Sequence, residues 1–599
     1  MLIQTIQHDD PPALKMRDWT KEYGPVYGFT EGPQQTMVIS DATLVNEIFN
    51  KQFDNFYGRK LRPIIGDPEK DKRINMFAAQ GKRWKRLRTL SSPSFSNNSL
   101  RKVKTTVQEC GTEILWNIEQ KVRNGEEIDM LLFYQEYTLG VISRIALGQS
   151  ESKMFKNPLL PKVKAIFNGS YHLFLITGIF PPIAQVFRKL SKSLPADFVP
   201  AFKIFDLIET AVEARIHQRE TDEQNGIEPG EPQDFIDLFL DAKSHEDFFG
   251  EKNEDFSKST TMKVNRELTF DEVIGQCFVF LAAGFDTTAL SLSYATYLLA
   301  THPGIQKKLQ EEVDRECPDP EISFDQLSKL KYMECVMKET LRLYPLGVTA
   351  NTRKCMRETT INGVTFEEGM NIQVDTWTLH HNPKIWGDDV EEFKPERWES
   401  SSLEHLEHNG SYIPFGAGPR QCIGMRLAQM EQKILLAQIL KEYTFLTTRN
   451  TQIPLKLVGK LTVSPESVLV NANTRKCMRE TTINGVTFEE GMNIQVDTWT
   501  LHHNPKIWGD DVEEFKPERW ESSSLDHLEH NGSYIPFGAG PRQCIGMRLA
   551  QMEQKILLAQ ILKEYTFRTT RNTQIPLKLV GKLTVSPESV VVKLEARDN

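Results

Sequence analysis

The sequence has few of the features that mark several classes of protein. Its 599 residues include only eight cysteines and no C-x-x-C pair, which argues against a disulfide scaffold and a zinc ribbon. Met1 to Leu14 contains Gln, His, Asp and Pro where a signal peptide or membrane anchor needs an unbroken apolar run, so we expect no targeting segment there. Positive charge is not in excess, because 72 Lys and Arg face 81 Asp and Glu for a net charge of -9. We therefore expect no nucleic-acid partner.

The composition is that of a large globular protein. Hydrophobic residues make up 39% of the chain and charged residues 26%, which excludes a disordered chain and a protein with many membrane spans. The length exceeds the roughly 250 to 300 residues at which a single core stops growing. The chain can therefore enclose a sizeable site.

A long internal duplication determines how the chain is divided. Residues 350–470 recur as residues 472–592 and differ only at Glu404/Asp526, Leu446/Arg568 and Leu469/Val591. Solenoid repeats are shorter, about 20 to 50 residues, and several must stack to bury a core. We interpret the extra 122 residues as a segmental duplication or a defect in the predicted coding sequence, which leaves 599 - 122 = 477 residues. We predict one working domain over 1–470 and a near-identical duplicate of 350–470, with a terminal strand, over 471–599.

The hydrophobic pattern predicts a mainly α-helical fold with a small β region. Apolar residues three and four apart indicate helices over residues 100–123, 126–147, 202–217, 273–301, 305–316, 324–343 and 425–443. Strand-like runs bounded by turn residues occur at 35–39, 360–364, 371–374 and 455–470. Residues 221–233, rich in Glu, Gly and Pro, predict an exposed loop.

A cysteine follows a glycine-rich loop where a long amphipathic helix begins. The segment runs from Phe415 through Gly-Ala-Gly-Pro-Arg420-Gln to Cys422 and then Ile-Gly. The N-terminus of a helix favours an anionic sulfur, so Cys422 is placed to be a thiolate, with Phe415 as a shield and Arg420 as a nearby cation. A free cysteine on its own is more often a small buried apolar residue. The whole F-x-x-G-x-R-x-C-x-G string favours a haem ligand.

This string resembles the haem-binding loop of the cytochrome P-450 family. The resemblance extends over residues 14–470 and is closest to the animal microsomal branch that oxidises drugs and steroids. It implies the cytochrome P-450 fold and haem b (iron protoporphyrin IX), with iron held by Cys422. The duplicate carries the same loop around Cys544. We predict that Cys422 binds the haem, because it directly follows the other motifs of the domain.

An acid and a hydroxyl interrupt the long apolar helix predicted over 273–301. They occur in Ala283-Gly-Phe-Asp286-Thr287. A membrane-spanning helix with a functional Asp is an alternative interpretation, because the segment exceeds the roughly 20 residues that cross a bilayer. Several Ser and Thr weaken that alternative. The resemblance implies that Thr287 steadies bound dioxygen and that Asp286 helps to supply protons, which makes these two residues the predicted catalytic pair.

Two further motifs receive supporting roles by the same resemblance. Glu339 and Arg342 lie three residues apart on a predicted helix, a spacing that alone indicates an ordinary surface pair. The family's structural network joins them to Arg397. Trp84, Arg88, Arg353 and Arg420 are implied to bind the haem propionates.

The cations around Trp84 have several possible roles. Lys82, Arg83, Lys85 and Arg86 could form a solvated face or a localisation signal. We predict a docking patch for an acidic redox partner.

The resemblance implies a monooxygenase that inserts one atom of dioxygen into a lipophilic small molecule. Its implied partners are an NADPH-dependent reductase, a small haem electron-transfer protein and a membrane surface. Its implied location is the cytoplasmic face of the endoplasmic reticulum membrane. The alternative is a catalytically silent haem- or lipid-binding protein of the same fold, which the intact Asp286 and Thr287 disfavour.

Overall fold

The computed structural model forms two compact units, Met1–Thr474 and Arg475–Asn599. It describes residues 11–123, 126–149, 154–168, 177–190, 200–227, 234–241, 268–319, 321–399, 403–459, 462–474, 481–483, 486–488, 496–520, 533–537, 547–575, 579–580, 586–587 and 589–597.

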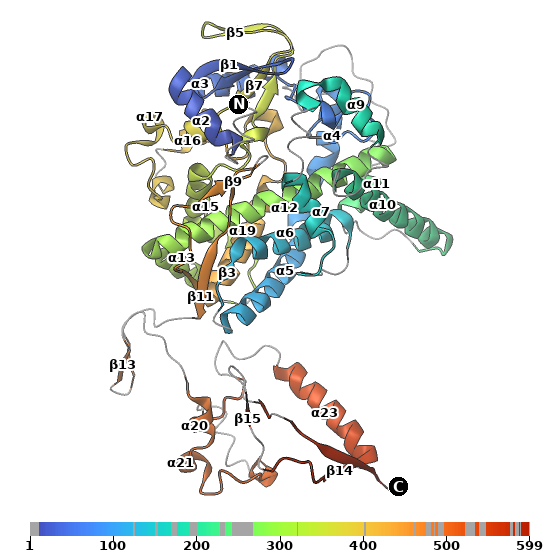
Figure 1. Ribbon diagram of the computed structural model, residues 1–599, viewed down its shortest axis with the longest axis vertical. Helices are drawn as coiled ribbons and strands as arrows, with labels where there is room; N and C mark the ends of the chain where they lie inside the picture. Colours follow the sequence, from blue (N-terminus) through green and yellow to red (C-terminus); the bar gives the residue numbers. More distant parts are fainter. Residues whose placement is uncertain are drawn as a thin grey trace. The chain divides into compact units, whose positions relative to one another are not determined.

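Helices dominate the first unit (Figure 1). They are α2 (Pro12–Tyr23), α3 (Ala42–Asn46), α4 (Gly81–Ser91), α5 (Asn97–Arg123), α6 (Met130–Leu147), α7 (Leu160–Asn168), α9 (Pro181–Leu190), α10 (Pro200–Gln224), α11 (Phe235–Leu240), α12 (Phe270–Thr301), α13 (Pro303–Glu316), α14 (Phe324–Lys329), α15 (Lys331–Leu343), α16 (Thr376–His380), α17 (Pro383–Trp386), α18 (Glu404–His408) and α19 (Met425–Glu442). Short 3-10 turns used below are η3 (Pro63–Ile65), η4 (Ser92–Phe95), η8 (Pro395–Trp398) and η10 (Gly418–Arg420).

The β structure of this unit is small, as predicted. One sheet has the order β1-β2-β7-β4, formed by β1 (Val26–Glu31), β2 (Gln34–Ile39), β7 (Asn371–Val374) and β4 (Thr352–Lys354). A second sheet has the order β3-β11-β8, formed by β3 (Ile128–Asp129), β11 (Leu469–Thr474) and β8 (Tyr443–Thr447). Two hairpins pair β5 (Thr359–Ile361) with β6 (Val364–Phe366) and β9 (Leu457–Val458) with β10 (Ser464–Pro465).

Helix α12 runs through the middle of the first unit and packs on α6, α10, α15 and α19 (Figure 1). It starts with a capping box in which Thr269 and Glu272 satisfy each other's backbone N–H groups. Gly284 allows the contact with α6, because a β-carbon there would lie 2.9 Å from Ile142 Cδ1. Among the described residues α12 is the one helix long and apolar enough to cross a membrane, and most of it is buried inside the protein. Burial and packing thus account for its apolar character.

Strand β11 crosses from the first copy of the duplication into the second. Its pairing with β8 joins Val470 to Thr447 and continues to Thr474 opposite Tyr443. Residues 472–474 open the second copy in sequence, yet they complete a sheet of the first unit. The first unit therefore ends four residues later than the predicted boundary at 470.

The second unit repeats the local structure of its template. It contains β12 (Thr481–Ile483), β13 (Val486–Phe488), α20 (Thr498–His502), α21 (Pro505–Trp508), η11 (Pro517–Trp520), α23 (Met547–Glu564), β14 (Tyr565–Thr569), β15 (Leu579–Val580), β16 (Ser586–Pro587) and β17 (Val592–Ala596). Helix α23 has the same sequence as α19, but its apolar side chains are exposed, among them Met552, Ile556, Leu557, Leu558 and Leu562. The described residues of the second unit thus do not form the core that α19 packs against in the first unit.

Candidate functional site

The Cys422 loop closes on itself just before α19 begins. The backbone N–H of Cys422 donates a 2.8 Å hydrogen bond to the carbonyl of Phe415. Gly418 has a φ of +70°, and a β-carbon there would lie 1.9 Å from the Phe49 carbonyl oxygen. Only glycine fits that position. Gly424 has no such constraint, because its β-carbon would lie an ordinary 3.9 Å from Cys422 Sγ.

Opposing effects act on the Cys422 thiol. Desolvation by the surrounding protein atoms raises its pKa, although the residue keeps exposed surface. The backbone N–H groups of Gly424 and Met425 and the charges of Arg88 and Arg59 lower it. Of the six cysteines in the described part of the chain, five are buried and Cys422 alone is exposed. A sulfur that is accessible, flanked by cations and next to a helix N-terminus is suited to bind a metal ion as a thiolate.

Four arginines lie around this loop: Arg59, Arg88, Arg353 and Arg420. Arg420 donates to the carbonyl of Ala79 at 2.7 Å, and its guanidinium carbon lies 4.6 Å from the centre of the Trp84 ring. Arg353 donates to the carbonyl of Ala417 at 2.9 Å. The carbonyls of the loop and of the segment before α4 thus hold these two side chains in place.

In the described part of the chain, no carboxylate acts on the pKa values of this arginine cluster. Burial, together with the nearby charge of Arg88 and against the opposing effect of Cys422, lowers the pKa of Arg59 to about 10. Burial lowers the pKa values of Arg353 and Arg420 well below their ordinary range, and neighbouring arginines add to the effect. The Nε atoms of Arg59, Arg353 and Arg420 are buried without a hydrogen-bond partner. Buried cations with unused donors need an anionic ligand, and the two propionates of a haem meet that need.

The predicted propionate residues therefore come together, with one addition. Trp84 is buried in α4. Arg88 lies one turn later, where burial lowers the pKa of its guanidinium and the charge of Cys422 opposes that effect. Arg59 was not predicted, because no motif surrounds it. An isolated bridge between Gly58 and Lys354 places its segment beside β4, and that pairing is not visible in the sequence.

Asp286 and Thr287 lie on α12 with different partners. Burial raises the pKa of Asp286 to about 6, against a hydrogen bond from Thr462 that lowers it. Thr287 Oγ1 donates to the Ala283 carbonyl at 2.8 Å. An acid with a pKa near neutrality can both take up and release a proton at physiological pH.

A phenylalanine connects α12 to the cysteine loop. The ring centres of Phe95 in η4 and Phe280 in α12 lie 5.2 Å apart. A β-carbon on Gly424 would lie 3.9 Å from the same Phe95 ring. Further along, Ser291 of α12 donates to Gln432 of α19 at 2.7 Å. These contacts tie the helix of Asp286 to the helix that follows Cys422.

Glu339, Arg342 and Arg397 form a buried network. The Glu339 carboxylate accepts from Arg342 at 2.8 and 2.9 Å and from Arg397 at 3.3 Å. The Glu339 and Arg342 side chains are fully buried, so this is not the exposed pair that their spacing alone suggests. Such charge-assisted bonds in a dry interior fix one geometry.

His380 connects that network to the cysteine loop. Arg342 donates to the His380 carbonyl at 3.1 Å, and His380 Nε2 accepts from the backbone N–H of Ile413 at 3.0 Å. Burial lowers the pKa of His380 to about 3, so the ring stays neutral and can accept. The network thus reaches the segment that leads into Phe415.

The structure does not support the predicted docking patch. Arg83 and Arg86 both pair with Glu272 at the start of α12, and Lys85 is buried. Of the four residues only Lys82 is exposed. Charges that neutralise a buried carboxylate attach α4 to α12 and are not available to a partner.

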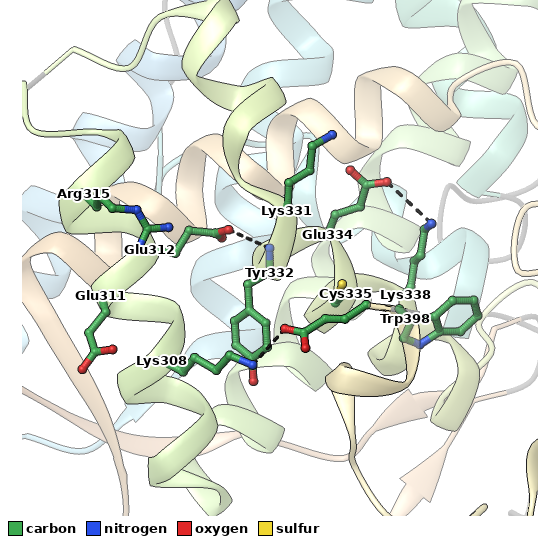
Figure 2. Close-up of a pocket in the computed structure, with 11 residues that line it drawn as sticks. Lys308, Glu311, Glu312, Arg315, Lys331, Tyr332, Glu334, Cys335, Lys338 and Trp398 are labelled. Atoms are coloured by element: carbon green, nitrogen blue, oxygen red, sulfur yellow. Dashed lines mark hydrogen bonds and ion pairs between the residues drawn. The ribbon is translucent and has the colours of Figure 1, made fainter. Parts of the chain in front are cut away.

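A cavity of about 630 Å³ lies near η8, and Figure 2 shows the residues that line it. Its charged side chains largely neutralise one another: Lys308 pairs with Glu396 and Glu399, and Lys338 faces Glu334. Glu312 accepts from the backbone N–H of Tyr332 at 2.7 Å. These contacts hold α15 against α13 and η8, and none of the residues lining the cavity belongs to the Cys422 loop.

The second unit repeats part of this framework. Arg519 contacts Asp511 at 2.8 Å, and Ile535 donates to His502 at 3.0 Å, as Arg397 and Ile413 do in the first unit. No arginine in residues 472–599 has a glutamate three positions before it, so a counterpart of the Glu339–Arg342 pair is missing. Cys544 lies outside the described residues.

Comparison with known proteins agrees with this geometry. The Cytochrome P450 family profile matches residues 1–472 and again residues 466–594. Cytochrome P450 CYP13A6 of Caenorhabditis elegans is 82% identical over 477 residues, which are 79% of this chain and 92% of the relative. CYP13A7 and CYP13A1 of the same species are 60% identical over 471 residues and 59% over 480. These matches do not favour the catalytically silent alternative. The chain belongs to the cytochrome P450 family of haem-dependent monooxygenases, oxidoreductases that take electrons from redox partners and oxidise small molecules.

Proposed function

We propose that this protein oxidises lipophilic small molecules with electrons from NADPH, delivered by an NADPH-dependent reductase and in part by a small haem electron-transfer protein. The cofactor is haem b, held by Cys422, and the duplicate Cys544 takes no part. The observation that carries the proposal is the arginine cluster with unused buried donors beside an accessible cysteine.

Each group of residues in the site has a separate role in the proposed reaction. Bound haem supplies the activation of dioxygen, and a thiolate ligand favours cleavage of the O–O bond. Cys422 provides that thiolate, while Arg59, Arg88, Arg353 and Arg420 hold the propionates and Trp84 packs against Arg420. Asp286 holds a proton near the reacting centre, and Thr287 offers its hydroxyl to pass that proton on.

The apolar surroundings of α12 favour a lipophilic substrate. The ring centres of Phe167 on α7 and Phe285 on α12 lie 6.2 Å apart, immediately before the acid. Ala283, one turn before Thr287, is exposed. Apolar walls with few polar groups bind apolar molecules.

The electron donor is proposed to bind on the outer side of the cysteine loop. A groove of about 360 Å³ there is bordered by the loop from Phe415 to Gly418 and by Gln421 and Met425. Because Gln421 adjoins Cys422 in the chain, a partner bound in this groove would have a short path to the cofactor.

An exposed apolar face supports association with a membrane. Phe180 and Val186, at the start and middle of the α9 region, are 59% and 58% exposed, and Ile179 and Ile183 are also exposed. The adjoining η3 adds Ile65. Such a face can lie in the interface of a bilayer, and we propose the cytoplasmic face of the endoplasmic reticulum membrane. Phe180→Asp with Val186→Asp should abolish binding to phospholipid vesicles, while changes to Asp at the exposed Leu132 should not.

Reconstitution tests the proposal. The purified protein, loaded with haem and mixed with a microsomal NADPH reductase, should oxidise members of a panel of lipophilic compounds with one product oxygen derived from dioxygen. Arg420→Ala together with Arg353→Ala should release haem while the fold is retained. A protein that binds haem as a thiolate complex but forms no oxidised product with any donor would contradict the proposal.

A further inference from the structure

A residue far from α12 in the sequence holds the carboxylate of Asp286. Thr462 Oγ1 donates a 2.7 Å hydrogen bond to Asp286 Oδ2, across 176 residues of chain. Thr462 lies two residues before β10, which begins at Ser464. The catalytic acid of one helix is therefore in contact with the β9–β10 hairpin.

A second contact fixes this hairpin on α12. Tyr294, eight residues or about two helical turns after Asp286, donates through its hydroxyl to the Val463 carbonyl at 3.1 Å. Val463 is buried. This contact anchors the residue next to Thr462 on α12, close to the point where the Thr462 hydroxyl reaches Asp286.

The hydrogen bond acts on the ionised form of the acid. A hydroxyl that donates to a carboxylate stabilises the charge, whereas burial destabilises it. Thr462 therefore opposes the effect of burial on Asp286. Thr287, the neighbouring hydroxyl, donates to its own helix, so Thr462 is the side-chain donor that this structure gives the acid.

We propose that Thr462 is a positioning residue that orients the Asp286 carboxylate and stabilises its charged form during proton delivery. This rests on the proposed function of Asp286. The role differs from a purely structural tie between hairpin and helix, because it predicts effects that depend on pH and on Asp286 itself.

The test compares Thr462→Val, which removes the hydroxyl at similar volume, with Thr462→Ser, which keeps it. In Thr462→Val the inflection in the pH profile of product formed per NADPH should move upward by about one unit, the worth of a hydrogen bond to a charged group. Thr462→Ser should restore the profile. Thr584→Val, at the matching position of the duplicate, is the matched control and should change nothing.

A readout independent of turnover accompanies it. Unfolding measured at pH 5 and pH 8 should show that Thr462→Val destabilises the protein more at pH 8, because Asp286 is ionised there and loses its donor. In an Asp286→Asn background this pH dependence should vanish. If both pH-dependent effects are absent, or if they persist without the Asp286 carboxyl, the inference is wrong. If the unfolding measurements show the expected dependence on pH and on Asp286 but the protein forms no product, the proposed monooxygenase function is wrong and the inference about Thr462 stands.

Discussion

Leu436 and Leu558 occupy the same position in two helices of identical sequence, yet Leu436 is 0% exposed in α19 and Leu558 is 48% exposed in α23. Identical residues differ in burial because α19 packs against partners such as α5, α12 and α13, while the second unit has no counterpart of those helices among its described elements. An exposed row of large apolar side chains favours aggregation.

Deleting residues 471–592 should therefore raise the soluble yield and lower the binding of an apolar dye. The deletion joins Val470 to Lys593, so the strand opposite β8 becomes the sequence that already pairs with β14 in the same register. Truncation after Thr474, which keeps β11 as it stands, is the control and should give the same gain. Unchanged aggregation in both proteins would show that α23 is covered in solution.

Thr287→Ala should keep bound haem but divert electrons into peroxide. Without the hydroxyl, proton transfer near the reacting centre loses its last donor, so product per NADPH should fall by roughly tenfold or more. Thr287→Ser should retain most of the coupling. Simultaneous measurement of NADPH, peroxide and product decides the matter: full coupling in Thr287→Ala would remove Thr287 from the mechanism.

Glu431→Gln should stabilise the protein at alkaline pH. Burial raises the pKa of Glu431, on α19, to about 8. The unfolded chain ionises this acid near pH 4 to 5, whereas the folded chain keeps it protonated, so wild-type stability falls by about 1.4 kcal/mol per pH unit between those values. Denaturant unfolding should show similar stabilities at pH 4.5 and a more stable variant at pH 8. A difference that does not vary with pH would mean that Glu431 is ionised at no extra cost.

Arg83→Ala and Arg86→Ala should lower stability, by about 1 to 3 kcal/mol each, because they leave the buried Glu272 carboxylate short of a partner. Lys82→Ala, on the exposed side of the same helix, should have little effect. Thermal unfolding measures both. If instead the Arg variants keep their stability and lose the salt dependence of reductase-driven turnover, the docking patch expected from the sequence would be correct after all.

Local features of the sequence predicted the site better than long-range ones did. The Cys422 loop depends on its own glycines and on the helix that follows, so the motif carries the geometry. Arg59 and Glu272 could not be assigned, since their roles arise from contacts with β4 and α4. The sequence predicts one helix over 324–343, whereas the structure has two, α14 and α15, separated at Leu330. The break was not predicted because the apolar pattern continues across it.

The reduced, carbon monoxide-bound absorption spectrum of two single variants tests the central claim most directly. Thiolate-ligated haem has a Soret band well to the red of histidine-ligated haem. The account predicts that Cys422→Ala loses this band and that Cys544→Ala keeps it at full intensity. Loss of the band in Cys544→Ala with retention in Cys422→Ala, or equal partial loss in both, would contradict the assignment of the first copy as the haem-binding one.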